Sequence, residues 1–126
     1  MIELPEGLYE VDQAYLVGES RQRVQLRDVT FEIFENKRGR KALKGRCFVR
    51  NFAFMELMQD NEKVHLALSF FDDYFLWLQE PMVQVGKVFD PDTESSLIFT
   101  IGKSIAFISQ AEFESRTGLQ EQPSPP

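Results

Sequence analysis

The chain has very few of the residues that build metal centres and disulfides. Its 126 residues include one cysteine, Cys47, and one histidine, His65. A single cysteine cannot form an intramolecular disulfide, and one cysteine with one histidine cannot supply a four-ligand Cys/His zinc site. No nucleophile elbow, metalloprotease motif or Gly-rich phosphate loop occurs. We therefore expect no metal, no cofactor and no catalytic activity.

Long hydrophobic runs are also missing. The most apolar stretch, Tyr74 to Leu78, is far shorter than the roughly 20 residues that a helix needs to span a bilayer. The first residues are acidic and lack the basic start and apolar run of a secretory signal. These features predict a cytoplasmic protein that does not enter a membrane.

Phenylalanine, in contrast, is abundant. It accounts for 12 of the 16 aromatic residues, and 43% of the chain is hydrophobic against 27% charged. This composition is typical of a folded domain with its own core, and the length is that of one domain. We expect residues 1–118 to form a single β-rich domain. The polar, Pro-rich residues 119–126 are predicted to be a disordered tail.

The net charge of −6 conceals an uneven distribution. Residues 1–19 carry −5 and residues 51–126 carry −8, whereas residues 20–50 hold ten of the fourteen basic residues and carry +7. A uniformly acidic surface would disfavour nucleic acid. A basic block within an acidic chain leaves nucleic acid open as a partner.

Most of the chain alternates between apolar and polar residues with a period of two, which is typical of half-buried strands. The alternating segments are 8–17, 24–33, 43–54, 63–71, 82–89 and 97–107. The phase changes at Arg27-Asp28, which indicates a bulge or a turn between two short strands. The pattern predicts a mainly β fold, a small antiparallel β-barrel or sandwich of six to seven short strands with a short C-terminal helix.

Two segments depart from the alternating pattern that is typical of a strand. Ser109 and Glu112 form a capping box, and Gly118 lies where a helix would end, so the helix is predicted between them. Residues 72–79 are apolar all round, and the pattern does not distinguish a helix from a strand there.

The segment after the predicted hairpin loop 36–41 has two different faces. Its odd positions are small and apolar and include Cys47, which we expect to be a buried, unreactive core residue. Its even positions interleave basic and aromatic residues, and the loop adds further cations. The resulting candidate binding residues are Lys37, Arg38, Arg40, Lys41, Lys44, Arg46, Phe48, Arg50 and Phe52.

Three interpretations of this face are open. Sequence-tolerant binders of single-stranded nucleic acid stack bases on aromatic rings and follow the phosphates with Lys and Arg. An acidic protein surface, including that of another copy, would be attracted by the same cations. In the third interpretation the rings are buried by a second layer, and the loop is an ordinary solvated turn.

A second candidate surface is the aromatic cluster Phe71, Tyr74, Phe75 and Trp77. Aromatic residues are enriched in interface cores, so these four residues indicate either an apolar interface, for example in a homo-oligomer, or a dense core. His65 is predicted to be an exposed or hydrogen-bonded strand residue.

Together these patterns favour a non-catalytic β-rich interaction module, an assembly, adaptor or regulatory subunit that binds a protein partner or itself. The alternative is a single-stranded nucleic-acid-binding barrel of the OB or SH3-like type that uses the basic hairpin. A barrel that holds a small apolar ligand is a third option.

Overall fold

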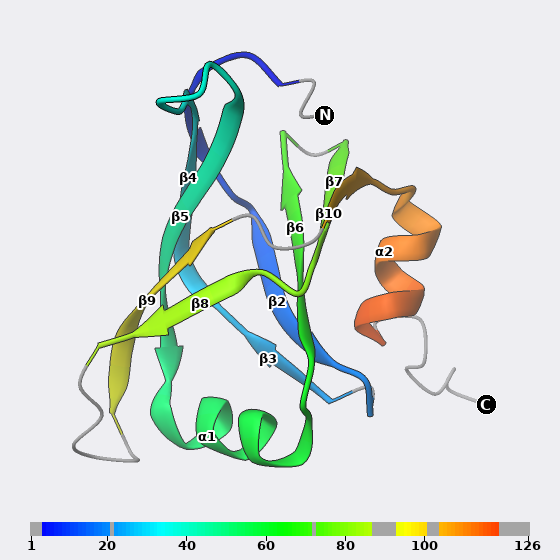
Figure 1. The fold of residues 1–126 in the computed structure, drawn as a ribbon. Coiled ribbons are helices and arrows are strands. Elements are labelled where there is room, and N and C mark those ends of the chain that lie inside the picture. The colour runs from blue at the N-terminus through cyan, green and yellow to red at the C-terminus, as the bar shows by residue number, and fades with distance from the viewer. Residues whose placement is uncertain (1–3, 21, 72, 87–92, 101–103, 119–126) are drawn as a thin grey trace.

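The described residues form ten strands in two antiparallel five-stranded sheets (Figure 1); nine come from the alternating segments and one from residues 72–79. The computed structural model describes residues 4–118 apart from 21, 72, 87–92 and 101–103. Sheet A has the strand order β1-β4-β5-β9-β8, and sheet B has the order β10-β7-β6-β2-β3. The strands are β1 (Gly7–Glu10), β2 (Gln13–Gly18), β3 (Arg23–Gln25), β4 (Arg27–Glu35), β5 (Lys41–Arg50), β6 (Val64–Phe70), β7 (Tyr74–Gln79), β8 (Met82–Val85), β9 (Glu94–Thr100) and β10 (Ser104–Phe107).

The predicted β class is confirmed, but the described residues contain ten strands instead of six or seven. Four stretches of the chain, β1–β2, β3–β4, β7–β8 and β9–β10, each contribute one strand to each sheet. Between β7 and β8, Glu80 has a positive φ of 48°. The phase change at Arg27-Asp28 is confirmed as a register irregularity in the β4–β5 pairing, where Asp28 has a φ of 51°. The two sheets are not closed into a barrel.

The space between the sheets is filled by large side chains. Phe31, Phe70 and Phe99 are fully buried there, and Tyr9 stacks on Phe31 with ring centroids 5.0 Å apart. Close packing of aromatic rings is the expected interior of a Phe-rich domain. This filled interior argues against the interpretation of a barrel that holds a small apolar ligand.

The loop between β4 and β5 is the predicted hairpin loop. The backbone N–H of Asn36 donates to the carbonyl of Arg40 at 2.7 Å, and Gly39 has a φ of +73°, which glycine adopts without steric cost. The alternation predicts a return strand that reaches Phe54, but β5 ends at Arg50.

Helix α1 (Asn51–Asp60) replaces the end of that predicted strand. The segment contains several strong helix formers, Ala53, Met55, Glu56, Leu57, Met58 and Gln59. Leu57 is buried in the main core, and the buried side chain of Asn61 donates to the Leu57 carbonyl at 3.0 Å. Asn61 also accepts a hydrogen bond from the Ser20 backbone at 2.9 Å, so the end of α1 is attached to the turn between β2 and β3.

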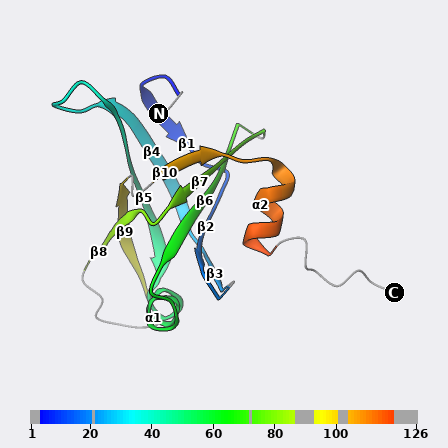
Figure 2. The ribbon, with the colours of Figure 1, turned by 45° about the vertical axis from the view of Figure 1, so that its right-hand side comes forward.

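Helix α2 (Gln110–Thr117) confirms the C-terminal helix. The hydroxyl of Ser109 accepts from the backbone N–H of Glu112 at 3.1 Å, and Gly118 adopts the left-handed conformation at the end. Two views show α2 on the side of sheet B that faces away from sheet A (Figures 1 and 2). Neither described helix is long and apolar enough to cross a membrane.

The segment left open between helix and strand is a strand, β7. Sheet B is covered by sheet A on one face and by α2 on the other, so β7 has apolar residues on both faces. Phe75 of β7 belongs to a second buried cluster with Tyr15, Ala67 and Phe113. The predicted tail 119–126 and the end of the predicted strand 82–89 lie outside the described residues.

Candidate functional site

Strand β5 is the central strand of sheet A, and its two faces differ as predicted. Leu43, Cys47 and Val49 are buried in the core. The alternate positions Lys44, Arg46, Phe48 and Arg50 are exposed on the outer face of the sheet, and the exposed fraction of Phe48 is 40%. The cations are therefore presented by a rigid, hydrogen-bonded strand instead of a loop.

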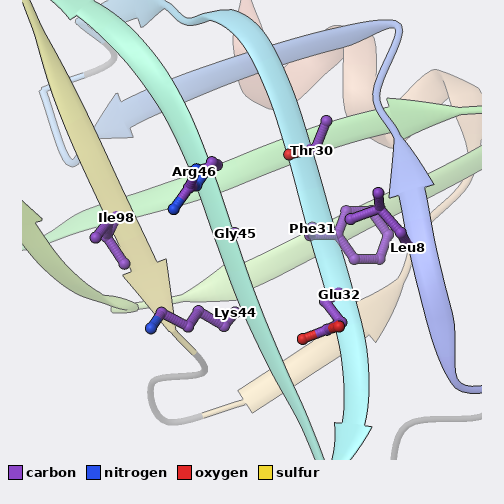
Figure 3. Close-up of a pocket in the computed structure, with 8 residues that line it drawn as sticks. All are labelled: Leu8, Thr30, Phe31, Glu32, Lys44, Gly45, Arg46 and Ile98. Carbon is purple, nitrogen blue, oxygen red and sulfur yellow. The ribbon is translucent and has the colours of Figure 1, made fainter.

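The neighbouring strands surround these cations with apolar side chains that sequence analysis did not identify. Lys44 is in register with Glu32 of β4 and Thr100 of β9, and Arg46 is in register with Thr30 and Ile98. Leu8 of β1, which is paired with Glu32, is strongly exposed. Figure 3 shows Lys44 and Arg46 between Ile98 on one side and Thr30, Glu32 and Leu8 on the other.

Two adjoining pockets follow this face. The first has a volume of about 390 Å³ and is lined by Leu8, Thr30, Glu32, Lys44, Arg46 and Ile98, among others. The second has about 200 Å³ and includes Asp28, Phe48 and Ser96. Arg46 and Ile98 line both pockets, so the two pockets are neighbours on this face of the sheet.

Phe48, which lines the second pocket, is partly covered by a cation. The guanidinium of Arg27 lies 5.3 Å from the centroid of the Phe48 ring. Arg27 also donates to both carboxylate oxygens of Glu94, with its Nη2 2.7 Å from Oε1, and this hydrogen bonding lowers the pKa of Glu94. Carboxylates thus lie among the cations, and the face has a mixed charge pattern.

The other predicted binding residues are distributed over different parts of the structure. Lys37, Arg38 and Arg40 are exposed in the β4–β5 loop. The Lys41 ammonium donates to the carbonyl of Leu4 at 2.8 Å and so holds the N-terminal segment. Phe52 does not lie on the β5 face, because it belongs to α1, where it is exposed.

Of the four residues of the predicted apolar interface, two are covered by α2 and two are exposed. Phe75 is buried under α2, with its ring centroid 5.0 Å from that of Phe113. Trp77 is partly buried, and the Arg116 guanidinium lies 4.7 Å from its ring centroid. Phe71 and Tyr74 are exposed at the β6–β7 turn, with Phe107 beside Tyr74.

Cys47 and His65 each have neighbours that explain them structurally. Burial raises the pKa of the Cys47 thiol to about 12, so the thiol is protonated at neutral pH. His65 stacks on Trp77 with centroids 5.2 Å apart, and its Nδ1 accepts the backbone N–H of Glu80 at 3.1 Å.

Burial also lowers the pKa of His65, because the imidazolium is less well solvated there than in the unfolded chain. The charged groups around it act in both directions: Glu80 and Glu19 raise its pKa, whereas Arg116 and Lys63 lower it. With the folded pKa below the unfolded value of 6.5, the unfolded state takes up the proton first as the pH falls. The neutral imidazole therefore contributes to the free energy of unfolding above pH 6.5, and this contribution is lost as the pH falls below 6.5.

We expect the free energy of unfolding to fall more between pH 7.5 and 5.5 in the wild type than in His65→Gln, because burial disfavours the imidazolium in the folded state. A glutamine amide can accept from Glu80 but does not titrate. Urea titrations of both proteins at the two pH values measure the difference. Carboxylates titrate in both proteins and cancel, so equal pH dependence of the two would contradict the assignment.

Among the residues that the structure describes, no group of three or more His, Cys, Asp or Glu side chains could hold a metal ion. The candidate functional site is the outer face of sheet A, with its two pockets. Comparison of the chain with models of known protein families found no match, and comparisons with curated proteins and with solved structures also found none.

Proposed function

We propose that the protein is a non-catalytic interaction module, an assembly, adaptor or regulatory subunit, that binds a protein partner through the outer face of sheet A. The observation that carries this proposal is the difference between the two sheets. Helix α2 packs on the outer face of sheet B, whereas neither described helix covers the outer face of sheet A. There Leu8, Phe48 and Ile98 remain at least partly exposed around Arg46.

The chemistry of the face indicates what kind of partner it would bind. Apolar side chains with arginine among them are the usual composition of an interface centre. Lys44 and Arg46 point from alternate positions of β5, so they match carboxylates at alternate positions of an extended peptide. Apolar residues of that peptide would contact Leu8 and Ile98. The expected partner is therefore an extended segment with acidic and apolar residues.

The non-catalytic part of the proposal is supported by the surroundings of Cys47 and His65. The thiol is buried in the core and protonated. The imidazole uses Nδ1 to accept from the backbone of Glu80 and stacks on Trp77, which is a structural role.

Selection from a displayed library of random peptides tests the binding surface directly. We expect the selected peptides to combine Asp or Glu with apolar residues, and Arg46→Glu to weaken their binding at least about tenfold, or about 1.4 kcal/mol. Arg38→Glu is the matched control, because it makes the same charge change in the exposed β4–β5 loop. Equal weakening by both variants, or no enriched peptide, would contradict the proposal.

A single-stranded nucleic acid is the second candidate, because Lys44, Arg46 and Arg50 share an exposed face with Phe48. Two observations oppose this candidate. The Arg27 guanidinium covers the Phe48 ring, and the carboxylates of Glu32 and Glu94 lie among the cations. Fluorescence anisotropy with labelled oligo(dT) and oligo(rU) distinguishes the two. Binding that weakens steeply with salt and is lost in Arg46→Ala/Arg50→Ala would favour nucleic acid over the peptide.

A further inference from the structure

A pocket of about 340 Å³ lies where α2 packs on the outer face of sheet B (Figure 2). One wall is a row of side chains across three neighbouring strands, because Ser69 of β6 is in register with Gln13 of β2 and Phe75 of β7. The volume lies within the range of small-molecule sites. The pocket is therefore large enough for a small organic ligand.

The other wall of the pocket is one face of α2. Gln110, Phe113 and Glu114 lie three and four residues apart, so their side chains share that face of the helix. The Phe113 ring is buried against Phe75, and Nε2 of Gln110 donates to Oε1 of Glu114 at 3.3 Å. A ligand in the pocket would contact the helix and the sheet at the same time.

The hydroxyl of Ser69 is the clearest sign that the pocket has an occupant. Only 6% of the surface of Ser69 is exposed, and the residue lines the pocket on the same face of β6 as Ala67, which packs under α2. Within the described part of the chain, this hydroxyl has no hydrogen-bond partner. Buried polar groups nearly always have one, so the hydroxyl is free to bind a ligand.

Two carboxylates determine the charge of the pocket. Asp12 lies beside the sheet wall and Glu114 on the helix wall, and none of the described residues that line the pocket is basic. A cation would therefore be attracted. The two carboxylates are too few for a metal site of three or more acidic, His or Cys ligands, and no such group occurs among the described residues. An organic cation matches this lining better than a metal ion.

We propose that this pocket binds a small aliphatic diamine. Its two ammonium groups would donate hydrogen bonds to the carboxylates of Asp12 and Glu114, and one of them also to the Ser69 hydroxyl. The aliphatic chain would lie against the rings of Phe75 and Phe113, whose faces also attract cations. The proposal does not depend on the proposed function, because the pocket shares no residue with the outer face of sheet A.

Isothermal titration calorimetry of the full chain with putrescine tests the site. We expect saturable binding with a dissociation constant on the order of 0.1 mM, which is reasonable for so small a ligand. Butanediol, which has the same chain without the charges, should not bind. Butylamine, which has a single ammonium group, should bind at least about tenfold more weakly.

Three variants identify the place where putrescine binds. Glu114→Gln removes the charge from the helix wall but keeps the side-chain shape, and it should weaken binding at least about tenfold. Glu112→Gln is the matched control, because Glu112 is on the same helix but exposed and paired with Arg116, and it should bind like the wild type. Ser69→Ala should weaken binding about fivefold without lowering the Tm of the free protein, since the hydroxyl has no partner to lose.

Amide exchange provides a second measurement, because a ligand that contacts both walls stabilises the docking of α2. Saturating putrescine should slow exchange in residues 110–117 of the wild type but not of Glu114→Gln. The absence of saturable binding, equal binding of putrescine and butylamine or butanediol, or equal weakening by Glu114→Gln and Glu112→Gln would overturn the proposal.

Discussion

Replacing Gly45 by alanine is expected to lower the free energy of unfolding by about 3 kcal/mol, the upper part of the range for overpacked cores. Gly45 lies in the middle of β5, in register with Phe31 on one side and Phe99 on the other. Both phenylalanines are fully buried. A Cβ atom at Gly45 would overlap the ring of Phe99, which lies across the glycine, so the ring would have to move within a close-packed core.

The sign of this effect distinguishes packing from intrinsic preference. Alanine is favoured over glycine in regular structure by roughly 0.5–1 kcal/mol, so without the Phe99 ring the same substitution would stabilise the protein. Urea unfolding of Gly45→Ala, Phe99→Leu and the double variant measures the coupling between the two positions. We expect Gly45→Ala to cost less in the Phe99→Leu background. A neutral or stabilising Gly45→Ala in the wild-type background would contradict the described packing.

The second large effect is expected for Phe113→Ala, which should weaken the packing of α2 on sheet B by about 3–5 kcal/mol. Phe113 is fully buried between α2 and sheet B, with ring centroids 5.0 Å from Phe75 and 6.2 Å from Tyr15. This cluster is separate from the core between the sheets. Loss of the ring should therefore detach α2 while the sheets remain folded.

Trp77, the only tryptophan, reports on this detachment because it lies at the boundary between α2 and β7. We expect its emission to shift to the red in Phe113→Ala, and amide exchange to increase in residues 110–117 but not in β5. Ser109→Ala, which removes only the helix cap, should have a smaller effect of about 1 kcal/mol. Equal exchange increases in α2 and β5 would show global unfolding and contradict the separation of the two clusters.

The parts of the fold that sequence alone could predict are those decided by local patterns. The alternation in β5 separates Cys47 and Val49 from Lys44 and Arg46 on any sheet with one buried face. The cap of α2 depends on Ser109, three residues before Glu112, and can be recognised without knowledge of the tertiary structure.

Helix α1 could not be recognised as easily, because Phe52 and Phe54 continue the period of β5 beyond its end. A ten-residue helix is only marginally stable by itself, so the burial of Leu57 and the attachment through Asn61 determine the outcome. The run of helix formers from Met55 to Gln59 was the available signal.

The candidate site was predicted in part for a similar reason. The cations come from one strand, whereas the apolar residues Leu8 and Ile98 come from strands far away in the sequence. Their proximity depends on strand order and register, which a single sequence does not reveal. For Phe75 and Trp77 the strand pattern leaves an interface and a dense core equally open, because it does not show that α2 covers them.

The passage of four chain segments from one sheet to the other has a consequence for how the protein folds. Since β1–β2, β3–β4, β7–β8 and β9–β10 each supply both sheets, neither sheet can be completed before the other has begun to form. The β5–β9 and β2–β6 pairings also join strands about 50 residues apart, which is a high contact order. We infer that the protein folds slowly, in milliseconds to seconds, and that both sheets form in the same cooperative step.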